Sequence, residues 1–261
     1  MKHKIHGQMS ESFLIAAFLS VSGGLQDAYT YISRGKVFAN AQTGNIVLFS
    51  QNIIAGNLKL SIHYFIPVIF FALGVAVAEC IRQKYRLLQK IHWRQLVLIA
   101  EIFLLFIVGF LPEKWNMLAN AMVSFACAMQ VQAFRKVNGY AFASTMCIGN
   151  MRSEMESFCA YERTHDKRIL KKAFCYLGII FMFAFGAGLG GLLISELGMR
   201  TIWISCAILL ISFMFMFIKE EIVENPELKE EKAAIRSDLH NIKEEAANME
   251  RILKDDLKMH H

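Results

Sequence analysis

The chain has 261 residues, of which 55% are hydrophobic, and it contains 21 Phe but only 3 Pro. Its mean hydropathy of +0.38 is too high for an ordinary soluble domain, whose residues are usually about 45–50% apolar even when Gly is counted. The formal net charge is +6, and the basic residues gather in loops between apolar runs, so we expect no nucleic-acid partner.

Six apolar runs follow one another along the chain, each close to the about 20 residues that a helix needs to cross a bilayer. They span residues 13–32, 62–81, 95–112, 115–134, 173–194 and 201–218. The first run is too long for the core of a cleavable signal peptide. The sequence therefore predicts an all-α, multi-pass protein of the inner or plasma membrane, with the lipid bilayer as its surroundings.

Two polar stretches interrupt the apolar pattern, "ANAQTGNIVLFS" (39–50) and "ASTMCIGNMRSE" (143–154). Both contain a Gly-Asn pair, and their candidate path-lining residues are Asn40, Gln42, Thr43, Gly44, Asn45, Gly149, Asn150 and Arg152. Gly would let the backbone turn, and the polar side chains would satisfy freed backbone groups or touch a substrate. The alternative is that the amides hold helices together by hydrogen bonds.

The second half of the chain resembles the first. An offset of 105 residues places Gly44-Asn45 on Gly149-Asn150, and an offset of 112 places "FALG" (71–74) on "FAFG" (183–186). Each half then contains one helix, one polar Gly-Asn segment and two further helices. This order of elements predicts an internal repeat.

The basic stretches 81–94 and 152–172 indicate how the repeat crosses the membrane, because Lys and Arg favour the cytoplasmic side. Both lie inside if the Gly-Asn segments are broken and re-entrant, which gives six transmembrane helices in an inverted 3+3 repeat with both termini cytoplasmic. Arg34 and Lys36 would then lie outside, against the rule. The alternative is eight crossing helices in a 4+4 repeat. The domains are an N-terminal segment (1–12), two membrane repeats (13–112 and 115–218) and a charged segment (219–261).

Polar residues within the apolar runs are further candidates for the substrate path. Asp27 is a candidate coupling site, because an intramembrane carboxyl is costly and usually functional; the alternative is that it caps a helix or pairs with Arg34 or Arg135. The amides beside or opposite it are Gln26, Gln130 and Gln132. We expect Glu79 and Glu101 to pair with Arg82 or Arg94 near the cytoplasmic edge.

The charged segment 219–261 has apolar residues at alternating steps of four and three from Ile235 to Leu253, which is typical of a heptad seam. We predict a cytoplasmic helix that could form a homodimer or bind a protein partner through residues 228–257.

The stretches "GGLQDAYTY", "FANAQTGNIVLF" and "ASTMCIGNMRSEMES" resemble the YoaK-type family of uncharacterised bacterial membrane proteins. The matching positions are Gly24 and Asp27, Thr43 to Asn45, and Gly149, Asn150 and Arg152, although Ile148 stands where a Thr would complete the second motif. The resemblance covers about residues 10–218. It implies a membrane location and a fold of six to eight helices, and it implies no substrate.

These observations favour a transporter or channel for a small solute or ion. The alternative is a membrane-anchored sensor or interaction protein that acts through its C-terminal helix. The sequence contains no GxSxG or HExxH motif and no second membrane Asp to pair with Asp27, so we expect no enzyme, no cofactor and no metal site.

Overall fold

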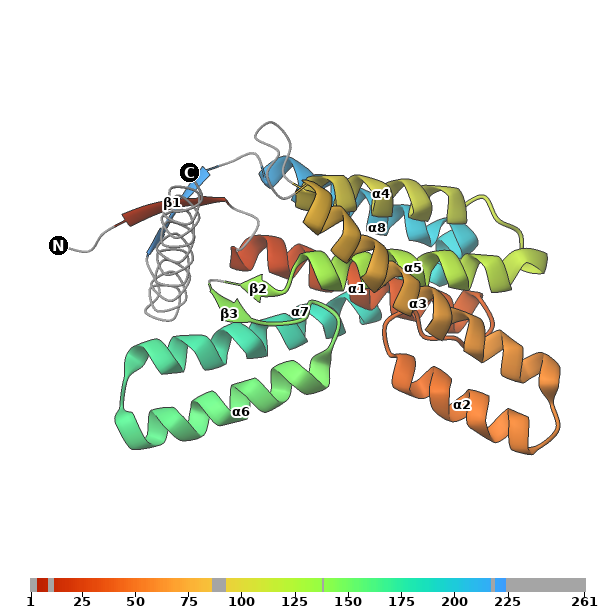
Figure 1. Ribbon diagram of the computed structural model, residues 1–261, viewed down its shortest axis with the longest axis horizontal. Coiled ribbons are helices and arrows are strands. Elements are labelled where there is room, and N and C mark those ends of the chain that lie inside the picture. Colours follow the sequence, from red (N-terminus) through yellow and green to blue (C-terminus); the bar gives the residue numbers. More distant parts are fainter. Residues whose placement is uncertain (1–3, 9–11, 86–92, 138, 217–218, 224–261) are drawn as a thin grey trace, which may run out of the picture. The chain divides into compact units, whose positions relative to one another are not determined.

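The computed structural model describes residues 4–8, 12–85, 93–137, 139–216 and 219–223 (Figure 1). This part of the chain is mostly helical, with α1 (Phe13–Ser33), α2 (Gln42–Ile54), α3 (Leu58–Tyr85), α4 (Trp93–Val108), α5 (Asn116–Ala133), α6 (Cys147–Thr164), α7 (Lys167–Leu197) and α8 (Ile202–Phe215). Two short 3-10 helices, η2 (Glu113–Trp115) and η3 (Gly198–Thr201), join α4 to α5 and α7 to α8. The predicted all-α class is thus confirmed in its coarse form.

Short strands complete the described part of the chain. β2 (Lys136–Val137) and β3 (Tyr140–Ala141) form an antiparallel pair between α5 and α6. β1 (Lys4–Gln8) and β4 (Lys219–Val223) form a second two-stranded sheet. The charged segment 219–261 therefore begins as a strand where we expected a helix, and its heptad region 228–257 lies outside the described residues. Residues 7–220 form one compact unit, and only this unit is discussed below.

The six apolar runs correspond to α1, α3, α4, α5, α7 and α8, and the Gly-Asn segments form α2 and α6. The expectation that the Gly-Asn segments are broken was wrong, because both are regular helices and neither Gly44 nor Gly149 has a positive φ. The turns lie before these helices instead, at Gly35 (φ 89°) and Gly139 (φ 84°). Gly adopts this left-handed backbone without the steric cost of a Cβ atom.

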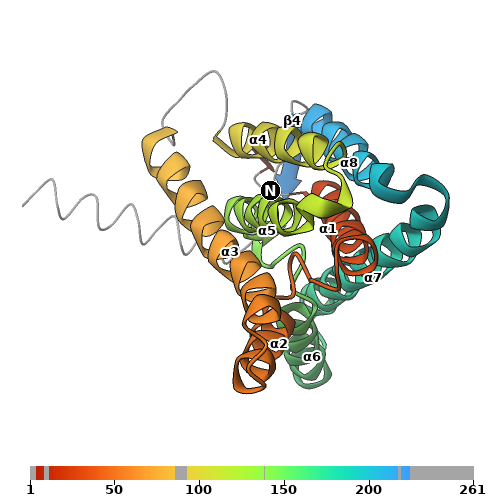
Figure 2. The same ribbon diagram turned by 90° about the vertical axis from the view of Figure 1, so that its right-hand side faces the viewer.

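Two helical hairpins have turns that the local sequence explains. Gly56, with a φ of 77°, ends α2 and lets α3 begin two residues later. At the other hairpin, His165 adopts the left-handed conformation after α6, and the Asp166 carboxylate accepts from the backbone N–H of Arg168 to cap α7. Because each turn is short, α2 packs along α3 and α6 packs along α7 (Figures 1 and 2).

The helix contacts of the first half recur in the second. α1 packs on α7 and α8, while its counterpart α5 packs on α3 and α4 (Figure 2). Glycines allow the closest approaches in corresponding places: a Cβ on Gly186 of α7 would overlap the α1 backbone at Val21, and one on Gly74 of α3 would overlap the α5 backbone at Phe125. These glycines occupy the positions that the offset of 112 aligns, so the repeated sequence corresponds to repeated packing.

The two longest helices carry apolar side chains on their outward faces. On α3 the exposed positions include Phe65, Ile69, Leu73 and Val77, and on α7 they include Phe174, Leu177, Phe181 and Phe185. Leu58–Tyr85 and the continuous stretch Lys167–Phe215 are long and apolar enough to cross a membrane. At 1.5 Å per residue, α3 is about 42 Å long, which exceeds a hydrocarbon core of about 30 Å.

Candidate functional site

The loops that lead into α2 and α6 meet at the middle of α1. Asn40 donates from Nδ2 to the carbonyl oxygen of Gly23 (3.2 Å), and the Thr145 methyl group lies against the same glycine, where a Cβ atom would overlap it. Asn40 and Thr145 are both buried, and they are equivalent at the offset of 105. Each keeps one side-chain oxygen without a partner, Oδ1 of Asn40 and Oγ1 of Thr145. Two equivalent positions of the repeat thus contribute unsatisfied oxygens to one buried region.

The asparagines of the two Gly-Asn pairs make the same contacts in both halves. Asn45 donates to the carbonyl of Phe38 (2.7 Å) and accepts from its N–H (3.2 Å). Asn150 donates to the carbonyl of Ala143 (2.7 Å) and accepts from its N–H (3.3 Å). Each amide satisfies both backbone groups of the residue seven positions earlier, which fastens the extended loop to the following helix. We call this pair of contacts the asparagine clamp.

The other candidate residues of the first polar stretch are half-buried or exposed. The Gln42 side chain donates to the carbonyl of Ala39 (2.7 Å) and accepts from the Asn45 amide (2.8 Å), so it extends the clamp. Thr43 is exposed and Gly44 is half-buried. In the second stretch, Gly149 and Arg152 are exposed, and Arg152 pairs with Glu156 on the surface of α6 (2.8 Å).

Asp27 lies one helical turn after Gly23 and faces the first loop. Its Oδ1 accepts from the backbone N–H of Asn40 (2.8 Å) and from the Asn40 amide (3.4 Å). The described residues provide Asp27 with no cationic partner, so the predicted alternative of an ion pair with Arg34 or Arg135 does not occur among them. A buried carboxyl that is held by donors but not by a cation suits a site that exchanges a positive charge.

Arg34 has a different role from the one that its sequence position suggested. It is fully buried, and its guanidinium donates to the Val108 carbonyl at the end of α4 (2.9 Å), to Oδ1 of Asn116 (3.1 Å) and to the Tyr29 hydroxyl (2.8 Å). A cation at a helix C-terminus satisfies free carbonyls and interacts favourably with the helix dipole. Arg34 therefore fastens α1 to the α4–α5 connection and is not an ordinary loop cation.

Gln26 is at the centre of a second buried polar group, which the sequence did not predict. Its amide nitrogen lies within hydrogen-bond distance of the hydroxyls of Ser22 and Ser205 (3.0 Å each) and of Glu101 Oε1 (3.3 Å). Its amide oxygen accepts from the Cys127 thiol (2.6 Å). The two serine hydroxyls also bond to each other. We call Gln26, Ser22, Ser205, Glu101 and Cys127 the Gln26 cluster; they come from α1, α8, α4 and α5.

The expected partners of Glu79 and Glu101 differ from the contacts observed. Glu79 pairs with Arg82 as predicted and also accepts from Gln132 (2.7 Å), which keeps Gln132 at the end of α5, away from Asp27. Glu101, in contrast, is fully buried in the middle of α4, and its expected pairing with Arg82 or Arg94 was wrong. The missed signal is its position on the buried stripe of α4, between Leu98 and Leu105.

Gln130 lies in the interior, as predicted. Its amide donates to the Ser144 hydroxyl in the second loop (2.9 Å) and to the Leu19 carbonyl of α1 (3.4 Å), while its amide oxygen has no partner. The predicted residues that are buried are thus Gln26, Asp27, Asn40, Asn45, Gln130 and Asn150, and Gln42 is half-buried. Within the described ranges, His, Cys, Asp and Glu nowhere gather in groups of three that could hold a metal ion.

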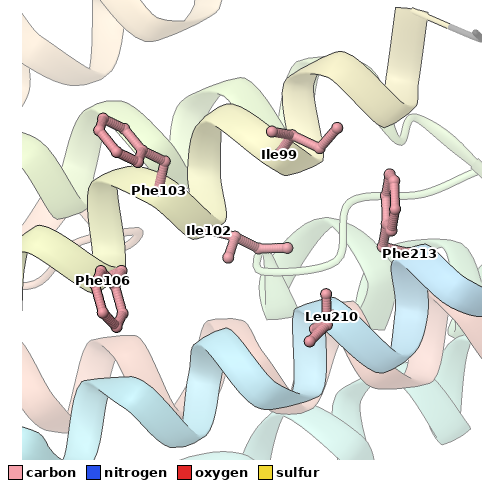
Figure 3. A pocket seen from close by; sticks show the side chains of 6 residues that line it. All are labelled: Ile99, Ile102, Phe103, Phe106, Leu210 and Phe213. Atoms are coloured by element: carbon pink, nitrogen blue, oxygen red, sulfur yellow. The ribbon is translucent and has the colours of Figure 1, made fainter.

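An apolar groove lies on the other side of α4 from Glu101. It has a volume of about 280 Å³ and is lined by Ile99, Ile102, Phe103, Phe106, Leu210 and Phe213, from α4 and α8 (Figure 3). Because its lining is aliphatic and aromatic, the groove could not coordinate an ion, and it does not belong to the polar site.

Comparison with known proteins gives a family. A family model described as "Protein of unknown function (DUF1275)" matches residues 15–215. The match runs from the first turn of α1 to the last residue of α8, so it includes both loops, both asparagine clamps and the Gln26 cluster. No curated protein and no solved structure matches the chain.

Proposed function

The chain belongs to the DUF1275 family, and we propose that it is an integral membrane transporter or channel for a small solute or ion. The observation that carries this proposal is the meeting of two equivalent loops at Gly23, where Asn40 and Thr145 each keep an unsatisfied oxygen and Asn40 also contacts the Asp27 carboxyl. Irregular backbone and free polar atoms are tolerated at membrane depth where they line protein or a path through it.

We propose that α1, α3, α4, α5, α7 and α8 cross the membrane and that α2 and α6 do not. α2 and α6 contain the two polar Gly-Asn segments and lie outside the six apolar runs, each of which is close to the about 20 residues that a crossing helix needs. The apolar outward faces of α3 and α7 support contact with lipid on both. Each half then contains three crossings and one re-entrant loop followed by a short helix.

Three crossings per half give the halves opposite orientations, and the charges support this arrangement. The basic stretches 81–94 and 152–172 would both be cytoplasmic, together with both termini. Arg34, which contradicted the positive-inside rule as a loop residue, is buried and serves as a helix cap. Inverted repeats whose discontinuous elements meet near the midplane are a recurring architecture of transporters.

Two narrower predictions remain part of this proposal. One is the likeness to the YoaK-type proteins, which is a finer assignment than membership of the family. The other is that the segment 228–257 forms a dimer or binds a partner; it lies outside the described residues.

The proposal is tested by measuring the flux of protons, Na⁺, K⁺, chloride and small neutral solutes, one at a time, across the membrane of proteoliposomes. If the loops line the path, Asn40→Ala, Thr145→Val and Asp27→Asn should each reduce the wild-type flux or change its dependence on pH or cations. Thr43→Val is the matched control, because Thr43 is in the same polar stretch but exposed. Equal flux through the three interior variants and the wild type would contradict a path at this site.

A further inference from the structure

The structure contains a second buried carboxyl, Glu101, which the proposed path through Asp27, Asn40 and Thr145 does not use. Glu101 is the ninth residue of α4, which has 16 residues, and none of its surface is exposed. The neighbouring buried positions of the same stripe, Leu98 and Leu105, are apolar. A carboxyl group at such a position is costly unless its charge is compensated.

Few donors surround the Glu101 carboxyl. Oε1 accepts one hydrogen bond, from the Gln26 amide (3.3 Å), and Oε2 accepts none. The Gln26 nitrogen has only two hydrogens, but three oxygens lie within reach of it, on Ser22, Ser205 and Glu101. At most two of these oxygens can receive an amide hydrogen at one time. Protein donors therefore leave a charge on Glu101 poorly satisfied.

The titratable groups packed around Glu101 provide no positive charge. α5 contributes the Cys127 thiol, which donates to Gln26, and α8 contributes the Cys206 thiol, which donates to the Ile102 carbonyl (3.7 Å). On α1 the residue after Gln26 is Asp27, an acidic residue whose carboxyl accepts from Asn40. The only described ion pair of α3 joins Glu79 to Arg82, near the end of that helix. No described cation contacts either carboxyl.

We propose that Glu101 binds a small monovalent cation, a proton or an alkali metal ion, within the Gln26 cluster. The carboxylate and the two serine hydroxyls of the cluster provide the oxygen ligands that hard cations prefer. A proton on Oε2 would neutralise the carboxyl, and an alkali ion would supply the missing counter-charge. In the proposed transporter, Glu101 would be a second cation-binding position besides Asp27. Cation binding at Glu101 does not require that the protein transports a solute.

The test is infrared spectroscopy of the full chain in lipid nanodiscs, comparing the wild type with Glu101→Gln. If the ligand is a proton, the wild type has a neutral-carboxyl carbonyl band at neutral pH that Glu101→Gln loses. If it is an alkali ion, replacing choline chloride by NaCl or KCl shifts a carboxylate band in the wild type but not in the variant. Glu79→Gln is the matched control, because Glu79 already has Arg82 as its counter-charge and should leave both signals unchanged.

Ser205→Ala keeps Glu101 and removes one oxygen from the cluster, so it serves if Glu101→Gln does not fold. It should shift the neutral-carboxyl band or weaken alkali-ion binding by about tenfold, the equivalent of one lost contact. The proposal is overturned if Glu101→Gln removes no carbonyl band and no alkali-sensitive band, or, where that variant does not fold, if Ser205→Ala leaves both signals as in the wild type. This experiment measures no flux, so a failure of the transport proposal would not alter its result. Conversely, if Glu101 binds no cation, the proposed path at Asn40 and Thr145 is not contradicted.

Discussion

Asn45 and Asn150 show how a repeated residue can be important for structure without facing a substrate. Each uses its amide N–H and its amide oxygen on the backbone of one loop residue, with distances that agree to about 0.1 Å between the two halves. The contact requires both a donor and an acceptor on one short side chain, which Asn provides and Asp does not. The sequence predicted that these positions matter, and the geometry favours the clamp as the reason.

We predict that Asn45→Ala and Asn150→Ala lower thermal stability to a similar extent. Each substitution removes two hydrogen bonds from the backbone of a half-buried loop residue, and a typical hydrogen bond contributes about 0.5–1.5 kcal/mol to stability. The measurement is the melting temperature of each purified variant in detergent, with Thr43→Ala as the exposed control. If either asparagine variant kept its melting temperature but lost flux, the amide would act on the substrate and not as a clamp.

At the scale of the helices, close packing depends on where glycines lie and not on how many there are. Gly186 and Gly190 of "GAGLGG" face α1, where a Cβ on Gly190 would come within 3.0 Å of Ala28, whereas Gly188 has no atom within 4 Å. The sequence of this segment, with four glycines in six residues, is typical of close helix packing. It could not show which glycine contacts another backbone, because that depends on the rotation of α7 about its own axis.

We predict that Gly186→Ala and Gly74→Ala both destabilise the protein, because each new Cβ would overlap the backbone of α1 or α5. Overpacking of this kind costs about 1–3 kcal/mol. Gly188→Ala and Gly149→Ala are the matched controls: both lie in helices with free space around them, and Ala is favoured over Gly there by about 1 kcal/mol. The melting temperatures should therefore fall for the first pair and remain or rise for the second. Destabilisation by Gly149→Ala would restore a special backbone role for that glycine.

Elements and individual residues differ in how well the sequence predicted them. The apolar runs, the offsets of 105 and 112 and the charged loops gave the order of the helices, because these signals extend over many residues. Glu101 and Arg34 were assigned wrongly because their roles depend on helix ends. The run 95–112 places Glu101 near its start, but α4 begins at Trp93 and ends at Val108, so Glu101 lies in the middle of the helix.

At the scale of the whole molecule, α1 carries two different polar sites in the interior. One is the meeting of the loops at Gly23 and Asp27, and the other is the Gln26 cluster. Under the exchange of halves, Ser22 corresponds to Cys127, and Glu101 corresponds to Cys206. Both members of each pair are buried, yet only one half supplies the carboxyl. The helices therefore follow the repeat while the chemistry does not. An asymmetric charge inside a symmetric framework would make the two sides of the membrane energetically different for a bound ion.

The last prediction tests the inverted topology on which this asymmetry depends. Single cysteines at Lys84 and Lys167 should resist an impermeant thiol reagent in intact cells, because both basic stretches would be cytoplasmic. Cysteines at Lys114 and Glu196 should react, because the α4–α5 and α7–α8 connections would face outward. All four positions are exposed in the structure, so the side of the membrane and not burial decides their reactivity.

The background for this experiment must lack the six native cysteines. Cys127→Ser is the suitable replacement at the buried position, because the hydroxyl can still donate to the Gln26 amide oxygen. Labelling after permeabilisation is the control for the two cytoplasmic positions. In the inverted model, one crossing separates Lys84 from Lys114, and one crossing separates Lys167 from Glu196. The reagent should therefore label Lys114 but not Lys84, and Glu196 but not Lys167. Reaction at Lys167 but not at Lys84 would mean that α6 crosses the membrane. If its counterpart α2 crosses as well, each half has four crossings, and the halves are then parallel and not inverted.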